Sequence, residues 1–543
     1  MRGLLTSAAD FVRDSILPNL LALIRRRQPV VWLLAVIVGV AVAYAILGFR
    51  ASIGLVQFLW LGTMVERVSS WAANKPAVLI VLAPAAGGLA VGLFLHYVMP
   101  GRRAEGVADV IEARATRGAR LPFLAGLGNA LVAAVSLGAG ASAGREGPAV
   151  HLGAVLASSL GRFFNLPPSA ARALLGCGVA AAVSASFNAP LAGALFALEV
   201  VLGHYALSAF IPIVIATVGA TVVTRLHFGD FPAFTIYDSQ ITSPFEFPAF
   251  LLLGIVCGLV AIAFQFSVMI ADRAARGLTM PLWLRPVIGG LVIGAIGAFL
   301  PEILGVGYEA TDHALKNQFG LAMLVTLVVA KMVATAITLA SRFGGGVFSP
   351  SLYLGAMTGG AFGIIAAGIY PDLASSPGVY AIIGMGAVAA AVLGAPISTT
   401  LIVFELTGGY EVTIALLLAI SASSALMQAV HGRSLFHWQL QTRGLILHEG
   451  AHRHIAHDIK VRDFLMPFGD DTPDIPSPPD PEVPLLAPGD TLEHALRVFD
   501  SSGRSRLLVR QGDGGELLGW AEQVKALDAY NAALIEASIE EHK

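Results

Sequence analysis

Charged side chains are scarce in this chain, and their scarcity decides its class. Only 13% of the 543 residues are Asp, Glu, Lys or Arg, whereas 56% are hydrophobic and the mean hydropathy is +0.75. In soluble globular domains about a quarter of the residues are charged, so a soluble globular protein is excluded. Apolar runs such as Val30 to Leu47 and Phe250 to Phe264 instead predict a polytopic membrane protein that lies in the lipid bilayer.

Cysteine is nearly absent as well. Cys177 and Cys257 each fall in an apolar segment, so the sequence predicts neither a disulfide framework nor a particular redox compartment. The formal net charge of -2 indicates little about binding partners. We expect no nucleic-acid partner, no metal and no cofactor.

Basic residues beside the apolar runs set the expected orientation. The first run follows the arginines at 25–27 and is too long for the core of a cleavable signal peptide, so we interpret it as a retained span. By the positive-inside rule, the N-terminus and the Arg-rich loop from Arg102 to Arg120 lie in the cytoplasm. The expected location is a bacterial inner membrane, crossed many times, with both termini cytoplasmic.

The chain becomes polar near residue 445. After the proline-rich stretch PDIPSPPDPEVP, Asp490 and Glu493 have the capping-box spacing that opens a helix. RLLVR and LLGWA predict two strands, and a closing helix is expected to end near Leu534. The predicted parts are an N-terminal cytoplasmic segment (1–29), a membrane domain (30–445), a linker (446–484) and a small α/β module (485–543) whose first strand is 460–466.

Two stretches of the membrane domain recur in the same order. GREGPAVHLGA, which contains Pro148, aligns with GVFSPSLYLGA, which contains Pro350. NAPLAGALFALE likewise aligns with GAPISTTLIVFE, and each ends in a glutamate nine residues after its proline, Glu199 and Glu405. The membrane domain is therefore predicted to be two related halves, at about 30–227 and 245–445, which is typical of transporters with a site between repeats.

Pro148 and Pro350 are expected in the first turn of helices that begin inside the bilayer. Proline fits there because the first turn needs no N–H from it. Such a helix start directs unpaired N–H groups and a partial positive charge into the membrane interior, where a small anion satisfies both. A carboxylate there competes with the anion, so Glu146 is predicted to be functional.

Two other interpretations of this stretch were open. Small residues at the density of GAGASAG often serve only to let membrane helices pack closely. GASAG around Ser142 also superficially resembles a serine-protease signature, which leaves an intramembrane serine hydrolase as a remote alternative. A hydrolase gives no reason for the mirrored segment at Pro350, so we expect a transporter and not an enzyme.

GREGP at 144–148, GGGVFSP at 344–350 and FNAPLAG at 187–193 together resemble the CLC family of chloride channels and chloride/proton antiporters. The likeness covers about residues 30–445, and the tail resembles one CBS motif, a module that also occurs in that family. The resemblance implies an all-α inverted-repeat fold with broken helices that meet at the bilayer midplane. It also implies a homodimer that moves chloride and similar small anions through a pore in each subunit, and the single CBS-like copy is expected to pair with the same motif of the second subunit.

The resemblance assigns roles at the outer end of the pore. Glu146 matches the family's gating glutamate, whose side chain occupies the outer anion site when ionised and leaves it when protonated or displaced. The backbone N–H groups of the flanking residues, Arg145 and Gly147, would hold the outer anion.

The resemblance also assigns the central anion site, where this chain departs from the family. Gly346, Val347 and Phe348 match its backbone donors, but Phe436 falls where the family commonly has a tyrosine whose hydroxyl touches the anion. Glu105, in AEGVA, replaces the serine of the family's Gly-Ser-Gly-Ile-Pro. A charge there would repel an anion, so Glu105 is expected to be protonated, to face away, or to lie in a loop that is built differently.

The expected proton path is a third departure. Antiporters of the family often have an internal proton-transfer glutamate where this chain has Val200, which cannot carry a proton. Glu199 or a file of water would have to replace it, although Glu199 and Glu405 are interpreted first as structural groups at helix ends. A chloride/proton antiporter is slightly favoured, protons being its second substrate, and a passive voltage- or pH-gated chloride channel remains the alternative.

Histidines are concentrated in LHEGAHRHIAHD, at the junction of membrane domain and tail. We interpret this stretch as a solvated linker rather than as a metal or pH-sensing site. The residues concerned are His448, His452, His454 and His457.

Overall fold

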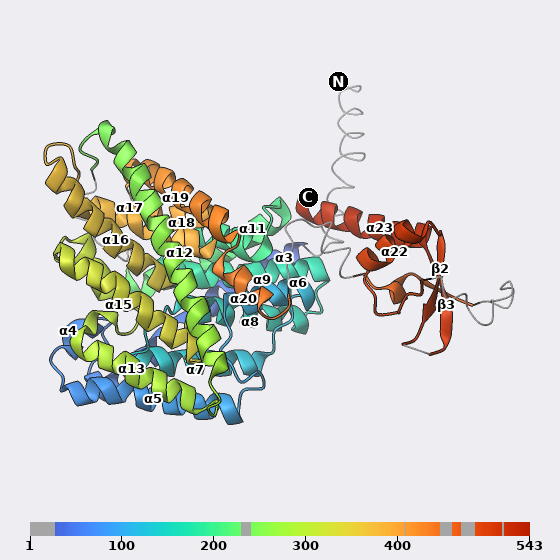
Figure 1. The fold of residues 1–543 in the computed structure, drawn as a ribbon, viewed down its shortest axis with the longest axis horizontal. Helices are drawn as coiled ribbons and strands as arrows, with labels where there is room; N and C mark the ends of the chain where they lie inside the picture. The colour runs from blue at the N-terminus through green and yellow to red at the C-terminus, as the bar shows by residue number, and fades with distance from the viewer. Residues whose placement is uncertain are drawn as a thin grey trace, which may run out of the picture. The chain divides into compact units, whose positions relative to one another are not determined.

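The computed structural model describes residues 28–229, 240–407, 409–445, 459–468, 484–512 and 515–542. The chain divides into two compact units, Met1–Tyr205 with Ala209–Thr442, and Ala206–Ser208 with Arg443–Lys543. We call them the membrane unit and the tail unit, and each is described by itself (Figure 1).

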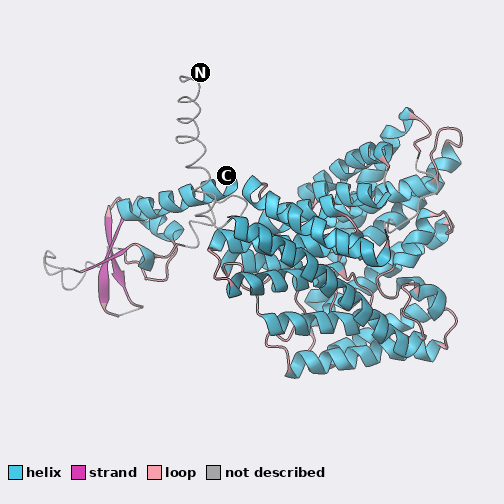
Figure 2. Ribbon diagram, turned by 180° about the vertical axis from the view of Figure 1, so that it is seen from behind, coloured by secondary structure: helices cyan, strands magenta, loops and turns pink. Residues whose placement is uncertain are grey.

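The described part of the membrane unit is built from helices, and the strands of Figure 2 all belong to the tail unit. Eight helical stretches of the described residues are long and apolar enough to cross a membrane. They contain the helices α3 (Gln28–Leu61), α5 (Ala77–Tyr97), α9 (Pro168–Phe187), α11 (Leu207–Phe228), α12 (Phe247–Gly277), α15 (Leu321–Ala340), α16 (Phe348–Ile369) and α19 (Tyr410–His431). The prediction of a polytopic membrane protein is confirmed.

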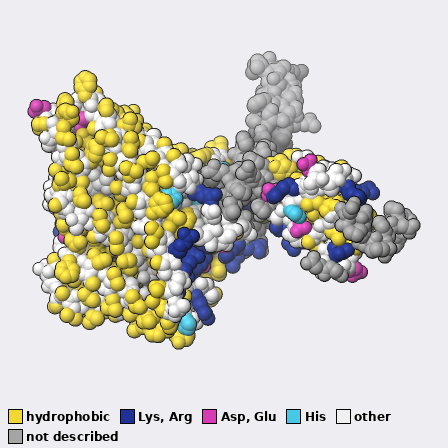
Figure 3. Space-filling view, viewed as in Figure 1, with side chains coloured by type: hydrophobic (Ala, Val, Ile, Leu, Met, Phe, Trp, Pro, Cys, Tyr) yellow, Lys and Arg dark blue, Asp and Glu magenta, His cyan; other side chains and the backbone are white. Residues whose placement is uncertain are grey.

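Shorter helices complete the membrane unit. They are α4 (Val68–Ala72), α6 (Val107–Thr116), α7 (Phe123–Gly138), α8 (Glu146–Phe163), α10 (Pro190–Phe196), η2 (Ala197–Leu202), α13 (Leu284–Phe299), α14 (Tyr308–Leu315), α17 (Pro377–Leu393), α18 (Pro396–Thr407) and α20 (Leu435–Gln441). The face of this unit in Figure 3 is covered mainly by hydrophobic side chains, as contact with lipid requires.

The two halves predicted from sequence repeat the same helix pair. Helix α8 packs against α9, and α16 packs against α17. A Cβ added at Gly153 would lie 2.3 Å from the carbonyl oxygen of Gly178, and one at Gly355 would lie 2.2 Å from that of Gly384. Because only glycine permits such close backbones, these aligned glycines fix the same packing in both halves.

The matched prolines lie in first turns, as predicted. Helix α8 begins at Glu146 and α16 at Phe348, so Pro148 and Pro350 are each the third residue of their helix. Helices α10 and α18 begin at the prolines of the second matched pair, Pro190 and Pro396. Four helices therefore start inside apolar sequence, at corresponding positions of the two halves.

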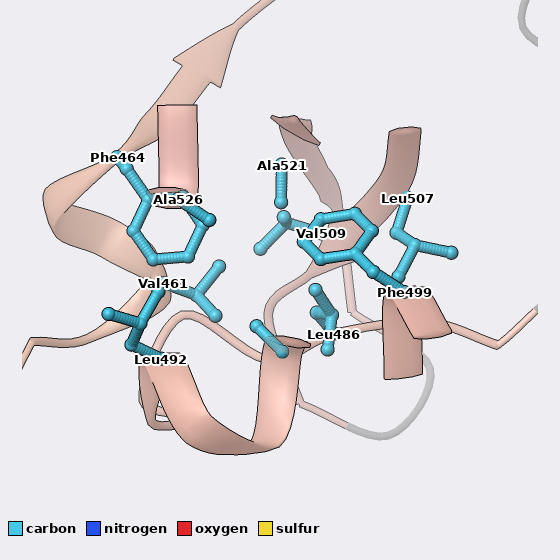
Figure 4. Close-up of a cluster of buried hydrophobic side chains, with 10 residues drawn as sticks. Val461, Phe464, Leu486, Leu492, Phe499, Leu507, Val509, Ala521 and Ala526 are labelled. Atoms are coloured by element: carbon cyan, nitrogen blue, oxygen red, sulfur yellow. The ribbon is translucent and has the colours of Figure 1, made fainter. Parts of the chain in front are cut away.

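The tail unit contains a three-stranded antiparallel sheet in the order β1-β3-β2. Its elements are η5 (Val461–Asp463), β1 (Leu465–Pro467), α22 (Leu492–Ser502), β2 (Arg506–Arg510), β3 (Leu517–Glu522) and α23 (Gln523–His542). Helix α22 covers the sheet with Leu492 and Phe499, which are buried with Leu507, Val509 and Ala521 of the strands (Figure 4). These aliphatic and aromatic contacts form a small core of its own.

Three details of the tail differ from the prediction. The first strand is Leu465–Pro467 and not 460–466, because the Asp463 carboxylate accepts the N–H of Lys460 at 2.8 Å and closes a helical turn there. The cap of α22 is Thr491 and not Asp490, since the Thr491 hydroxyl accepts the N–H of His494 at 3.1 Å. Helix α23 continues past Leu534 to His542, because no glycine or proline interrupts it.

Candidate anion site

The two halves are joined where their broken helices begin. Gly144 and Gly346 exchange two backbone hydrogen bonds, each 2.7 Å between nitrogen and oxygen, and form an antiparallel bridge. A Cβ at Gly147 would lie 3.2 Å from Cα of Gly346, so the backbones approach as closely as glycine allows. The starts of α8 and α16 therefore meet at one place inside the membrane unit.

Glu146 occupies this meeting place. The residue is 2% exposed, and its Oε2 accepts the backbone N–H of Ser349 at 3.3 Å. Its Oε1 accepts the hydroxyl of Tyr308 at 2.6 Å. Ser349 is the second residue of α16, so the carboxylate of one half lies at the helix N-terminus of the other half. The carboxylate thus holds a position that suits a small anion.

Gly144 makes room for this carboxylate. A Cβ at that position would lie 2.7 Å from Oε2 of Glu146 and 3.0 Å from the nitrogen of Ser349. Any side chain there would displace the carboxylate from the helix start.

An ion-pair network lies beside Glu146. Nη1 of Arg145 lies 2.5 Å from Oε1 of Glu66, and Nη2 of Arg50 lies 2.9 Å from the same oxygen. Partial burial acts to raise the pKa of Glu66, but the two guanidinium charges outweigh it and lower that pKa to about 2. Glu66 lies in the loop after α3, and its side chain is 45% exposed.

A pocket borders the network. It contains about 620 Å³ of empty space, part of it open to solvent, and its lining includes Arg50, Glu66, Arg145 and Tyr308. Tyr308 therefore both lines the pocket and donates its hydroxyl to the Glu146 carboxylate. The pocket thus places two arginines and a phenol next to Glu146.

The residues matched to the central anion site lie at the start of α16 and on α20. Val347 and Phe348 are 3% and 4% exposed, and Val347 caps the helix that Phe348 begins. The ring of Phe348 lies 5.1 Å from that of Phe187, between ring centroids. Phe436 is 6% exposed, on a helix that packs against α6 and α17. Apolar rings and backbone N–H groups are therefore what this region offers an anion.

Glu105 is engaged by a histidine. Its Oε2 lies 3.1 Å from Nε2 of His151, a fully buried residue of α8. The side chain of Asn129 accepts the Glu105 N–H at 2.8 Å and donates to its carbonyl oxygen at 2.7 Å, which fixes the loop. Of the three expectations for Glu105, the geometry corresponds to a carboxylate directed at a partner of its own, on α8.

Glu199 and Glu405 cap helices of the opposite half. The Glu199 carboxylate accepts the N–H groups of Ile397 at 3.0 Å and Ser398 at 2.7 Å, at the start of α18. The Glu405 carboxylate accepts those of Leu191 at 3.0 Å and Ala192 at 2.8 Å, at the start of α10. Each negative charge thus lies on a positive helix end, in a reciprocal pair. Val200 follows Glu199 in the π-helical turn η2.

Two residues of this region were not singled out from the sequence. Lys331 is a single cation within the apolar run of α15, which was a usable signal because charges inside spans are seldom without a function. It is fully buried and donates to the carbonyl oxygens of Ile303 at 3.0 Å and Gly305 at 2.9 Å. Tyr308 gave no such signal, because its place beside Glu146 depends on residues far away in the sequence.

The other residues singled out from the sequence are Ser142 and four histidines. The hydroxyl of Ser142 is buried and donates to the Ile303 carbonyl oxygen at 2.7 Å, which is a structural contact. The four histidines at 448, 452, 454 and 457 lie outside the described residues. Within the described part of the chain, no group of three or more His, Cys, Asp or Glu side chains could hold a metal ion.

Known proteins resemble this chain over most of the membrane unit. The profile of the family described as voltage gated chloride channel matches residues 87–428. A ClcB-like chloride channel protein of Ralstonia nicotianae is 32% identical over 411 residues, which are 74% of this chain and 96% of that protein.

Solved structures show the same fold. A slow cyanobacterial Cl⁻/H⁺ antiporter has a TM-score of 0.68 at 22% identity, over 76% of this chain and 97% of its own. A eukaryotic CLC transporter has a TM-score of 0.66 at 18% identity, over 91% of this chain and 97% of its own. The predicted CLC-type fold is confirmed. The chain belongs to the voltage-gated chloride channel (CLC) family, whose members transport anions across membranes.

Proposed function

We propose that this protein exchanges chloride and similar small anions for protons, with Glu146 as the gate. The observation that carries the proposal is the place of the Glu146 carboxylate, on the N–H of Ser349 and the hydroxyl of Tyr308. An ionised carboxylate on these donors excludes an anion from them. A protonated carboxyl binds helix N-termini less well, so proton uptake and anion entry are linked at one group.

Backbone donors supply most of the anion binding in this proposal. The N–H groups of Arg145 and Gly147 serve the outer anion, and those of Val347 and Phe348 serve the central one. Gly346 was also expected to serve the central anion, but its N–H already donates to the carbonyl oxygen of Gly144 at 2.7 Å. The hydroxyls that the family places at the central site are missing, because Phe436 has none and the Glu105 carboxylate faces His151. The central site would therefore select among small anions less by side-chain chemistry than by the size and dehydration of the ion.

A passive chloride channel is the second candidate, and one observation favours it. The Glu199 carboxylate is already bonded to the N–H groups of Ile397 and Ser398, and Val200 beside it cannot titrate. No carboxylate at this position is then free to bring protons to Glu146 from the inner side. Water would have to carry them if the protein is an antiporter.

Liposomes that contain the purified protein distinguish the two candidates. For an antiporter, an outward chloride gradient drives proton uptake with no proton gradient imposed, and the reversal potential moves with pH. Robust chloride flux without proton movement would exclude the antiporter and support the passive channel. Glu146→Ala is the matched control, because it should keep chloride flux and lose any coupled proton movement.

The proposal extends to the assembly of the protein. Family resemblance supports a homodimer in a bacterial inner membrane with both termini in the cytoplasm. The tail unit has one three-stranded sheet covered by α22, and we propose that it is a CBS-like module that pairs with the tail of a second subunit. Cross-linking of single cysteines placed on the two tails of a dimer tests this pairing.

A further inference from the structure

Tyr308 reaches Glu146 from outside the two broken helices, on α14. Its hydroxyl donates to Oε1 of Glu146 at 2.6 Å, and the hydroxyl of Ser349 lies 3.4 Å from the same phenol oxygen. We infer that Tyr308 is a latch that holds the ionised Glu146 carboxylate on the N–H of Ser349 and releases it when the carboxyl takes up a proton. This inference rests on the gating role proposed for Glu146.

The loop before α14 is built to hold the phenol in place. Gly305 and Gly307 have positive φ angles of 63° and 92°, which favour glycine and turn the chain toward Tyr308. Lys331 donates to the carbonyl oxygens of Ile303 and Gly305 from inside the membrane unit. The buried amino group thereby has two acceptors, and both belong to the loop that precedes the tyrosine.

The ring of Tyr308 is also held by Arg145. The guanidinium carbon of Arg145 lies 4.9 Å from the ring centroid, a cation–π distance, while Nη1 of the same guanidinium binds Glu66. Nε of Arg145 is 4.0 Å from Oε1 of Glu146, so its charge also favours the ionised gate. The phenol hydroxyl is thus aimed at the carboxylate by contacts that do not involve Glu146.

Charged groups near Glu146 influence how readily its carboxyl takes up a proton. Those that line the pocket beside Tyr308 are Arg50, Glu66, Arg145, Glu302 and Glu309. Glu66 is paired with both arginines, and Glu309 accepts hydrogen bonds from Ser69. On α14 itself, Asp312 is paired with Lys316 at 2.6 Å. Tyr308→Phe keeps these charged groups and removes the phenol hydroxyl, which donates to Glu146 and lies 3.4 Å from the hydroxyl of Ser349.

The latch predicts two linked changes in Tyr308→Phe. A hydrogen bond to a charged group contributes about 1.5 kcal/mol or more, which corresponds to about ten-fold. Without it the carboxylate leaves its seat more readily, so chloride binding at about pH 7.5, where carboxyl groups are ordinarily ionised, should tighten about ten-fold. Proton uptake by Glu146 should also occur at a lower proton concentration, which moves half-maximal flux up by about one pH unit.

Two control variants separate the latch from a structural role. Tyr353→Phe removes another phenol of the membrane unit, which is fully buried and has no hydrogen-bond partner among the described residues, and it should leave both readouts unchanged. Glu146→Gln removes the charge that the latch holds. Adding Tyr308→Phe to Glu146→Gln should therefore change chloride affinity by much less than it does in the wild type.

Calorimetric chloride titration in detergent and chloride flux in liposomes, each as a function of pH, test the inference. Tighter binding and an upward shift for Tyr308→Phe, both absent in the Glu146→Gln background, are the expected result. Wild-type affinity and pH dependence in Tyr308→Phe would overturn the latch and leave the gate intact. An equal effect in the Glu146→Gln background would also overturn it, because the phenol would then act on the anion or the loop. If the wild type neither binds nor moves chloride, the proposed function itself fails.

Discussion

Replacing Glu199 by Gln should weaken the fold and leave proton coupling unchanged. The Glu199 carboxylate accepts two N–H groups at the start of α18, from Ile397 at 3.0 Å and Ser398 at 2.7 Å. A carboxylate used in this way is a helix cap rather than a proton carrier. Glu405 is its symmetric counterpart on α10 and serves as the matched control.

The expected loss follows from these contacts. Glutamine keeps one acceptor oxygen, so one bond falls from about 1.5–3 kcal/mol toward the roughly 1 kcal/mol of a neutral bond, and the other is lost because an amide NH2 group cannot accept it. The lost interaction with the helix dipole adds about 0.3–1 kcal/mol. We expect Glu199→Gln and Glu405→Gln each to lower the free energy of unfolding by roughly 2–6 kcal/mol, which in a chain of this length is an apparent Tm lower by roughly 2–5 °C.

Thermal unfolding in detergent and chloride-driven proton uptake in liposomes are measured on both variants. Similar losses of Tm, with the wild-type ratio of protons to chloride, support the cap. The reasoning is refuted if Glu199→Gln abolishes proton uptake at an unchanged Tm while Glu405→Gln does not, because Glu199 would then carry protons. If the wild type moves no protons, the two Tm values alone decide whether the carboxylates act as caps.

Three further predictions concern the pore and the network beside it. Glu146→Gln should make chloride flux independent of pH between about pH 4 and 8, where a buried carboxyl can titrate, and flux as pH-dependent as that of the wild type would contradict the gate. Phe436→Tyr should tighten chloride binding by about 1 kcal/mol in calorimetry by restoring a hydroxyl, and an unchanged affinity would mean that this residue does not line the site. The pKa of Glu66 is lowered from 4.5 to about 2, so its ion pairs stabilise the fold above pH 4.5 and are lost as the pH falls toward 2. Glu66→Gln should therefore lower the Tm at pH 6 but not near pH 2, and an equal loss of Tm at both pH values would contradict the pairing.

Much of this protein follows from local sequence. Long apolar runs require helices in a bilayer, because the backbone must satisfy its own hydrogen bonds there. Glycines followed by a proline predicted helix starts inside the membrane, and α8 and α16 begin two residues before Pro148 and Pro350. The matched segments predicted the two halves, since the same side chains must make the same packing contacts in each.

The tail unit shows how far secondary structure can be predicted from neighbouring residues alone. RLLVR and LLGWA were predicted as strands because short runs of such side chains fit the partly buried surface of a sheet. Both are strands in the structure. The cap of α22 was misplaced by one residue, because Asp490 and Thr491 both suit a cap and the Asp490 carboxylate instead accepts the N–H of Ala487 at 2.7 Å. Neighbouring residues of equal propensity are distinguished only by the contacts that the folded chain offers them.

The sequence by itself determined that this is a polytopic membrane protein, that its membrane domain has two related halves, and that Glu146 is a charged residue at a helix start inside the membrane. It could not determine what each polar group touches, because those partners come from distant segments. Glu199 caps a helix of the other half, Glu105 faces His151, and Tyr308 reaches Glu146 from a different part of the chain. Periodicity and propensity depend on neighbours within a few turns, whereas a buried charge is stabilised by whichever donors the packing brings within about 3 Å. Only the tertiary structure decided those donors, because they follow from how the two halves pack around the starts of their broken helices.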